Sequence, residues 1–116
     1  MRLLDLDPSF LCLEIKDDGG LIFHFVDRLD EADGVKFLCP KCFAKNGGSV
    51  GTHAVICWSR SRGVPEDVTP GPGRWKMVGT GLGDLTLDAD PPSTARSVFL
   101  NGGCGWHGFV TKGEVT

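Results

Sequence analysis

Two short stretches hold the strongest signal in the chain: Phe37-Leu38-Cys39-Pro40-Lys41-Cys42 and Cys104-Gly105-Trp106-His107. Each stretch places two metal-binding side chains three positions apart, where a short apolar run meets a turn containing Gly or Pro. This spacing lets both side chains of a pair reach one ion, and three thiolates with one imidazole fill a tetrahedral zinc shell. We therefore predict one structural Zn²⁺, bound by Cys39, Cys42, Cys104 and His107.

The two pairs are separated by 61 residues, so a shared metal would join distant parts of the chain and restrict its unfolded state. Three other uses of these cysteines stay open: a disulfide, a thioredoxin-like redox pair at Cys39 and Cys42, and simple burial. The redox interpretation requires a helix that begins at Cys39 within a β-α-β unit, and the sequence predicts neither. A tetrahedral, thiolate-rich site also accepts iron in place of zinc.

Composition favours a small all-β domain. The chain has 116 residues, a length typical of one domain, and 17 Gly with 7 Pro make 24 residues that interrupt regular elements. A helical bundle is excluded on this ground, and we expect six to eight short, mainly antiparallel strands in a sandwich-like arrangement. The strands are expected at residues 9–16, 21–26, 35–38, 53–58, 74–78, 84–87, 97–100 and 108–111.

The connections between these strands are also predicted from turn residues. The turn Asp17-Asp18-Gly19-Gly20 predicts that the first two strands form an antiparallel hairpin. Residues 27–34 are expected to be a loop or a single helical turn, and Cys39-Pro40-Lys41-Cys42 a tight turn. Residues 59–73, with three prolines, are predicted to be the longest loop.

Charge divides the chain into two parts. Residues 1–33 carry nine acidic and three basic side chains, a net charge of −6, whereas the remaining residues carry nine basic and six acidic side chains, or +3. We therefore describe one zinc-binding β domain, residues 1–116, made of an N-terminal acidic hairpin (1–34) and a zinc-stapled core (35–116).

No apolar run approaches the roughly 20 residues that span a bilayer, and the expected location is cytosolic, without a membrane partner.

The other histidines and cysteines have less specific surroundings. His53 precedes a predicted strand and is a candidate to hydrogen-bond near the metal or to replace a ligand. Trp106 lies inside the second ligand stretch and is expected to shield the metal from water. His24 is expected at the surface, and Cys12 and Cys57 are expected in the core because they lie within strand patterns.

A group of basic and aromatic residues follows the predicted strand at 53–58. Such a mixture is one footprint of nucleic-acid binding, because phosphates pair with cations and bases stack on rings. The alternative is a solvated loop beside core tryptophans, and the acidic N-terminal part would repel a polyanion. The candidate partner-binding residues are Trp58, Arg60, Arg62, Arg74, Trp75 and Lys76.

Further motifs accompany the two ligand stretches: Trp75 with Gly79-Thr80-Gly81, Leu85-Thr86-Leu87, and Gly108-Phe109-Val110-Thr111-Lys112-Gly113-Glu114-Val115. On these motifs, residues 35–115 resemble a small uncharacterised protein family that is common in phages and prophages. Its members are labelled hypothetical phage proteins or, wrongly, ammonia monooxygenases, and relatives occur near bacterial ubiquitin-like conjugation genes. The family often has Pro-Ser directly after its Thr-Leu, whereas here Pro92-Ser93 is displaced, and the first 34 residues have no match.

The resemblance implies a zinc-binding, β-rich domain with the ligand role on Cys39, Cys42, Cys104 and His107, and it implies no activity. The sequence also lacks a phosphate-binding loop and a complete catalytic set, so no catalytic residue is assigned. We expect a non-enzymatic phage or prophage accessory protein that binds another protein, in the virion or in the host cytoplasm. The alternatives are a zinc-dependent nucleic-acid-binding protein and a metal-dependent, hydrolase-like enzyme that uses His53 and a carboxylate such as Asp84.

Overall fold

The computed structural model describes residues 1–71, 73–100 and 103–116. Pro72, in the predicted long loop, and Asn101 and Gly102, which precede the second ligand stretch, lie outside the described residues. The strands are β1 (Ser9–Ile15), β2 (Leu21–Val26), β3 (Gly34–Leu38), β4 (Ala54–Trp58), β5 (Trp75–Val78), β6 (Thr86–Ala89), β7 (Val98–Phe99), β8 (His107–Gly108), β9 (Val110–Thr111) and β10 (Glu114–Val115). One helix, α1 (Pro40–Asn46), and four 3₁₀ turns, η1 (Leu3–Leu6), η2 (Leu29–Glu31), η3 (Arg60–Arg62) and η4 (Leu82–Asp84), complete the described elements.

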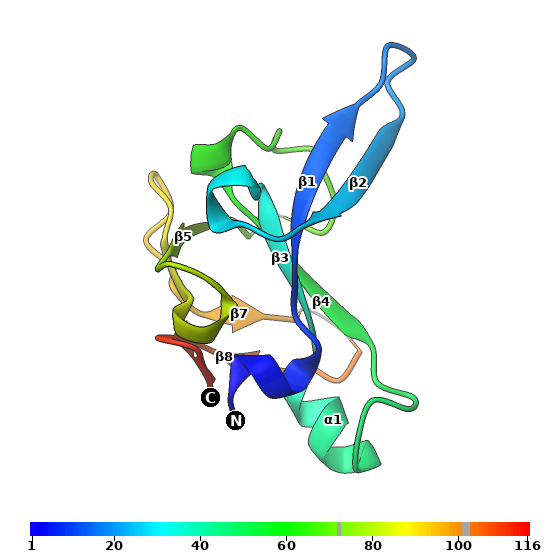
Figure 1. Ribbon diagram of the computed structural model, residues 1–116, viewed down its shortest axis with the longest axis vertical. Helices are drawn as coiled ribbons and strands as arrows, with labels where there is room; N and C mark the ends of the chain where they lie inside the picture. The colour runs from blue at the N-terminus through cyan, green and yellow to red at the C-terminus, as the bar shows by residue number, and fades with distance from the viewer. Residues whose placement is uncertain (72, 101–102) are drawn as a thin grey trace.

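The predicted mainly antiparallel β fold is confirmed. Strands β2, β1, β3 and β4 form one sheet in that order, with antiparallel neighbours throughout. Three two-stranded ladders, β5–β6, β7–β8 and β9–β10, lie to one side of this sheet (Figure 1). The described residues contain ten strands, more than expected, because the C-terminal stretch bends into three strands of two residues each.

The main core lies between the sheet and the smaller ladders. From the sheet it takes Phe10, Val35, Phe37, Val55 and Cys57, which are all buried. The ladders contribute Trp75, Met77, Leu87, Val98, Trp106, Val110 and Val115. Since these residues come from nearly the whole chain, the core forms only when distant segments have met.

The N-terminal segment contributes two residues to this core, which the sequence did not indicate. Leu3 and Leu6 of η1 are fully buried in it. The Leu3 N–H donates to the Gly113 carbonyl (N···O 2.8 Å), and Arg2 forms a β-bridge with Glu114. The two ends of the chain therefore lie side by side (Figure 1).

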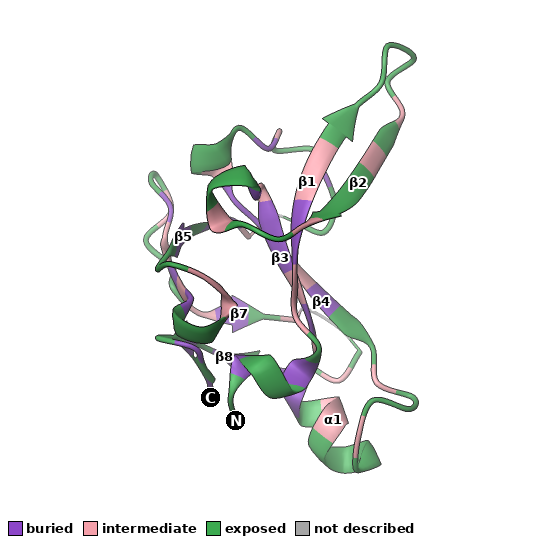
Figure 2. Cartoon of the chain, viewed as in Figure 1, coloured by how far each residue is buried: buried purple, intermediate pink, exposed green. Residues whose placement is uncertain are grey.

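A second, smaller cluster lies on the opposite face of the sheet. It contains Leu11, Trp58, Val64 and Val68, the last two from the long loop after β4. Gly34 allows this contact, because a Cβ at that position would lie 2.6 Å from the Trp58 ring. Burial falls off toward the β1–β2 hairpin, whose outer half is largely exposed (Figure 2).

The predicted tight turn at Cys39–Cys42 is wrong, because α1 begins there. Pro40 occupies the first helical turn, where its missing N–H costs nothing, and Gly47 ends the helix in the left-handed conformation with φ of 68°. The redox interpretation of Cys39 and Cys42 required a helix at this place, and α1 meets that requirement. It also required parallel strands on either side of the helix, whereas β3 and β4 pair antiparallel. A thioredoxin-like β-α-β unit is therefore not formed.

Candidate metal centre

Four side chains from three separate segments meet at the end of the sheet that carries α1. They are Cys39, Cys42, His53 and Cys104, and their potential donor atoms all lie within 4.8 Å of one another. Cys39 is buried, Cys42 and Cys104 are half-buried, and His53 is exposed. The group therefore lies at the edge of the core, with one side open to solvent.

Strand pairing brings Cys39 and His53 together. Strands β3 and β4 are in register with Leu38 opposite Ala54, so the next residues outward are Cys39 and His53. The Cys39 N–H donates to the His53 carbonyl (N···O 2.9 Å), which continues the ladder by one pair. The fourth member of the group is thus supplied by the residue immediately before a strand.

Helix α1 positions the Cys42 thiol, and Lys41 on the same helix positions the turn that carries Cys104. Cys39 precedes the helix and Cys42 lies in its first turn, so a three-residue separation brings both thiols to the same end of α1. The Lys41 ammonium, also on α1, donates to the Cys104 carbonyl (N···O 2.7 Å). This bond ties the turn that carries Cys104 to the helix.

The distances fit a tetrahedral zinc site. Zinc bonds of about 2.3 Å to sulfur and 2.0–2.1 Å to nitrogen imply ligand separations of about 3.8 Å between sulfurs and about 3.5 Å between sulfur and nitrogen. The Cys39 and Cys104 Sγ atoms lie 3.5 Å apart, and His53 Nε2 lies 3.4 Å from Cys104 Sγ. His53 Nδ1 faces the Ala54 carbonyl at 3.3 Å, which favours the tautomer that leaves Nε2 free for a metal.

The thiols of the group have unlike acidities. The hydrogen bond with His53 is the main cause that lowers the pKa of Cys104 to about 6. Desolvation is the main cause that raises the pKa of Cys39 to about 11, although the backbone amides of Cys42 and Lys41 oppose it. A cation between these sulfurs would favour the thiolate form of both and offset the burial of Cys39.

His107, predicted as the fourth ligand, does not join the group. It lies in β8 opposite Phe99, and the two rings are 4.9 Å apart between centroids. Neighbouring residues of an extended strand point to opposite faces, so Trp106, which enters the core, directs His107 outward. The structure corrects the expected ligand set: His53, considered for a supporting role or as a replacement ligand, takes the position assigned to His107.

Trp106 lies beside the group, as its place in the motif suggested. Its ring is 7% exposed and packs edge-on against Phe37, two residues before Cys39. Its backbone amide also hydrogen-bonds the Cys104 sulfur and favours the thiolate, a further cause of the low pKa of Cys104. Trp106 therefore fills the core directly behind the cysteines.

The predicted basic and aromatic group is mostly engaged within the fold. Trp58 and Trp75 are buried, and their indole N–H groups donate to the carbonyls of Thr69 and Ser97. Arg60 pairs with Glu66 and donates to the Asp90 carbonyl, and Arg62 donates to the Asp30 carbonyl. Lys76 is exposed. These contacts do not assemble the six residues into one open basic surface.

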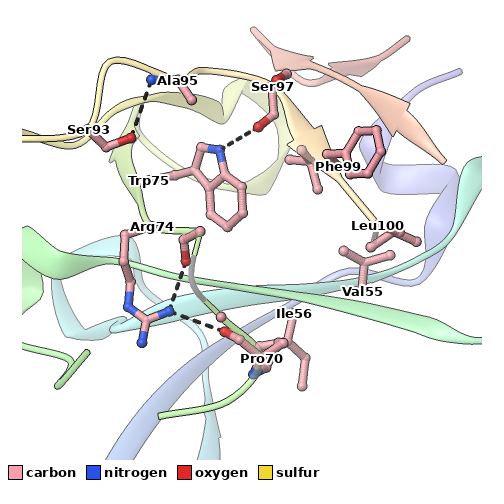
Figure 3. Close-up of a pocket in the computed structure, with 13 residues that line it drawn as sticks. Val55, Ile56, Pro70, Arg74, Trp75, Ser93, Ala95, Ser97, Phe99 and Leu100 are labelled. Atoms are coloured by element: carbon pink, nitrogen blue, oxygen red, sulfur yellow. Dashed lines mark hydrogen bonds between the residues drawn. The ribbon is translucent and has the colours of Figure 1, made fainter. Parts of the chain in front are cut away.

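Arg74 and Trp75 line a cavity of about 750 Å³ beside β4 (Figure 3). Val55, Phe99 and Leu100 contribute to its apolar walls. The Arg74 guanidinium is buried and donates to four backbone carbonyls, those of Pro65, Val68, Pro70 and Gly73. Its Nε–H has no partner in the described part of the chain but is itself buried, so a molecule in the cavity would not reach it without rearrangement.

The remaining candidates lie away from the centre. His24 is exposed and lies 2.8 Å from a Glu14 carboxylate oxygen, and Cys57 is buried in the main core. Cys12 is half-buried, and all five cysteines are free thiols. Asp84 accepts hydrogen bonds from the backbone amides of Thr80 and Gly81 and from the Thr80 hydroxyl.

No protein family, curated protein or solved structure matches this chain. The resemblance to a phage protein family therefore stays a prediction. None of the described helices has the length and apolar character needed to cross a membrane.

Proposed function

We propose that this chain is a non-enzymatic protein-binding module whose fold is held by one structural Zn²⁺. The observation that carries the proposal is the convergence of Cys39, Cys42, His53 and Cys104, with donor atoms within 4.8 Å, from three segments of the chain. Three thiolates and one imidazole form a complete tetrahedral set. Such a set closes the turn of Cys104 onto β3, β4 and α1 and leaves no coordination position for a substrate.

A structural role is favoured over a hydrolytic one by the donors that are present. A hydrolytic zinc needs an open coordination position and a nearby carboxylate base. Among the residues that the structure describes, the group able to hold a metal contains four donors and no Asp or Glu. His53 belongs to that group, and Asp84 is engaged by the backbone of its own loop.

Protein binding is favoured over nucleic-acid binding by the surface. Arg60, Arg62 and Arg74 contact an acidic group or carbonyls of the same chain, and of the basic side chains near the tryptophans only Lys76 is exposed without such a contact among the described residues. In contrast, the hairpin exposes apolar side chains within the segment whose net charge is −6. The proposed setting, a phage or prophage accessory protein acting in the virion or the host cytoplasm, is supported by the motif resemblance alone.

The metal is tested by elemental mass spectrometry and X-ray absorption on the purified protein. We expect one zinc per chain with three sulfur neighbours at about 2.3 Å and one nitrogen at about 2.0–2.1 Å. Cys104→Ser should lose the metal, whereas Cys12→Ser should keep it and serves as the matched control. A bound water in the zinc shell would favour the enzyme alternative, and iron or no metal in the wild type would contradict the proposal.

The binding role is tested with the zinc-loaded protein immobilised in a lysate of the organism that encodes it. Captured proteins are identified, purified and titrated against the free chain, with single-stranded DNA titrated in parallel at two salt concentrations. We expect saturable binding of at least one protein and no salt-sensitive binding of DNA. DNA binding without any protein partner would reverse the choice between the two functions.

A further inference from the structure

Strand β2 leaves one row of its backbone groups unpaired. On β1, the Leu13 N–H donates to the Asp33 carboxylate, and the Leu11 carbonyl accepts from the Asp33 N–H, so these odd-numbered residues face β3. Hydrogen-bonding directions alternate along an antiparallel strand, so the even-numbered residues of β1 face β2. Their partners on β2 are Ile22, His24 and Val26. The N–H and C=O groups of Leu21, Phe23 and Phe25 therefore point away from the sheet, and no hydrogen bond reaches them from the described residues.

The same three residues carry exposed apolar side chains. Leu21 is 50% exposed, Phe23 46% and Phe25 64%. The register places them on one face of the hairpin with Ile15, and the middle residue of the row, Phe23, contacts the Trp58 ring. The same three residues thus carry both the free backbone groups, which point outward in the plane of the sheet, and the apolar side chains, which stand on one face of it.

This edge lacks the usual protection against strand pairing. Natural edge strands are blunted by proline, by lysine, by a bulge or by a covering segment. Strand β2 reads Leu-Ile-Phe-His-Phe-Val from residue 21 to residue 26, and its pairing with β1 is continuous over six residue pairs. An exposed edge of this kind is a template for an added strand.

The charges around the edge indicate what kind of strand it accepts. Exposed carboxylates lie at both ends of β2, at Asp17 and Asp18 before it and at Asp27 after it. The face opposite the aromatic rings carries Glu14, paired with His24. Residues 9–27, which form β1, β2, their turn and the residue after β2, carry four acidic side chains and one basic one, a net charge of −3, so a basic segment would be attracted and an acidic one repelled.

We infer that β2 binds an extended segment of another protein, with alternating apolar and basic residues, as a fifth strand of the sheet. Apolar side chains of that segment would cover Leu21, Phe23 and Phe25, and its basic side chains would face the Glu14 side and the acidic ends of β2. A second copy of this chain is disfavoured as the occupant, because residues 9–27 of two chains, each with a net charge of −3, would meet. This inference rests on the proposed protein-binding function and assigns the partner class and the contact surface.

The experiment uses the zinc-loaded full chain and a synthetic seven-residue peptide of alternating lysine and valine. Hydrogen exchange of the amides is followed by NMR without and with the peptide. We expect fast exchange at Leu21, Phe23 and Phe25 in the free protein and about tenfold or greater slowing on binding, with Ile22 and His24 protected in both states. A glutamate–valine peptide should bind at least about tenfold more weakly, and added salt should narrow that difference.

Two variants at one position separate the aromatic ring from the backbone donor. Phe25→Ala removes the ring, whereas Phe25→Pro removes the ring and also the outward N–H. Proline is tolerated at such a position because the missing N–H of an edge strand faces solvent and not a neighbouring strand. We expect affinity to fall in the order wild type, Phe25→Ala, Phe25→Pro. Phe109→Ala, which removes another exposed phenylalanine away from β2, should bind as the wild type does. Zinc content and thermal melting verify that each variant is folded.

Each outcome decides the inference. Slowed exchange confined to the outward amides of β2 supports it, and the absence of binding or protection elsewhere overturns it. Self-association of the protein through β2, detected by sedimentation, would replace the basic segment by a second copy. Failure of the proposed function is a separate outcome, in which no protein partner is captured at all. If a captured partner binds Phe25→Pro as tightly as the wild type, the protein-binding function stands and only the assignment of the contact surface to β2 is overturned.

Discussion

The two ends of the molecule are built on the same pair of strands but are completed in different ways. The chain measures 42 Å along its longest axis, with α1 near one end and the β1–β2 hairpin at the other (Figure 1). Strands β3 and β4 connect them, with Leu38 opposite Ala54 at the helix end and Gly34 opposite Trp58 at the hairpin end. The helix end gathers three thiols and an imidazole, whereas the hairpin end leaves a strand edge exposed.

This contrast separates stability from recognition. At the helix end, donor atoms from segments distant in sequence lie within 4.8 Å of one another, so a bound metal would cross-link these segments and stabilise the folded state. At the hairpin end, β1 and β2 are neighbours in sequence, and the apolar side chains of β2 stay largely in solvent. We therefore expect substitutions at the helix end to change stability and substitutions at the outer hairpin to change binding.

The largest expected effect comes from the two histidines that distinguish the observed centre from the predicted one. His53→Ala should lose zinc and lower the Tm by more than about 10 °C, because a metal cross-link is removed. His107→Ala should keep its zinc and lower the Tm only slightly, since its ring contacts exposed Phe99. Zinc content and thermal melting of both variants give the result. Retention of zinc by His53→Ala with loss from His107→Ala would restore the ligand set predicted from the sequence.

The stability contributions of two phenylalanines, one buried in the core and one exposed on the hairpin, can be compared by substituting each with alanine. Phe37 is 1% exposed and packs against Trp106, so Phe37→Ala should reduce the free energy of unfolding by about 3–5 kcal/mol. Phe25→Ala should cost less than about 1 kcal/mol, because its ring is mostly exposed and contacts the Lys36 ammonium at 5.5 Å. Denaturant unfolding measures both values. Equal losses would show that the outer hairpin contributes to stability as the core does.

A smaller effect is expected where the second cluster meets the sheet. Gly34→Ala would place a methyl group 2.6 Å from the Trp58 ring and 2.7 Å from the Cys57 carbonyl, and should cost about 1–3 kcal/mol. Gly81→Ala is the matched control, because nothing lies within 4 Å of its added Cβ. The midpoints of denaturant unfolding are compared. An unchanged midpoint for Gly34→Ala would mean that Trp58 moves away at no cost.

The smallest effect concerns two carboxylates that accept turn amides, Asp84 between β5 and β6 and Asp18 in the turn of the hairpin. Asp84 accepts bonds from the Thr80 and Gly81 amides, and these bonds lower its pKa, whereas Asp18 accepts one bond, from the Gly20 amide. A carboxyl with a lowered pKa stabilises the fold above its unfolded-state pKa, and this contribution is lost as the pH falls through the folded-state value. Asp84→Asn should therefore be slightly less stable than the wild type at pH 7, with the difference closing in acid, and Asp18→Asn should differ less. The free energy of unfolding of the wild type and of both variants is measured from pH 7 into acid at fixed salt. A stability difference between Asp84→Asn and the wild type that did not change with pH would contradict the lowered pKa of Asp84.

Local patterns predicted the strands well because side chains alternate between the two faces of a strand whether or not both faces are covered. Leu11, Leu13 and Ile15 alternate with polar residues and form β1, and the Asp-Gly turn that follows joins β1 to β2 as expected. The two cysteines of the C-x2-C pair were also predicted together with Cys104, because their spacing suits one ion. These features depend on neighbouring residues or on side-chain chemistry.

The missed features depend on contacts between distant segments. His53 joins the centre because β3 pairs with β4 so that Leu38 lies opposite Ala54, and a single sequence does not specify that register. A usable signal was present: Cys39 directly follows one predicted strand and His53 begins the next, so an antiparallel pairing of the two could place them together. Leu3 and Leu6 were missed because a six-residue segment of three leucines mixed with charged residues is too short to show a period, and the C-terminal strands they meet are too short to predict.

The contact between the chain ends determines how this molecule can be attached to anything larger. The Met1 amino group donates to the Val115 carbonyl at 3.1 Å, so both ends leave the fold at one place. That place lies away from the β1–β2 hairpin (Figure 1). A fusion at either terminus, or at both in tandem, would hold the body near the junction and leave the tip of the hairpin projecting outward, free to meet an incoming chain.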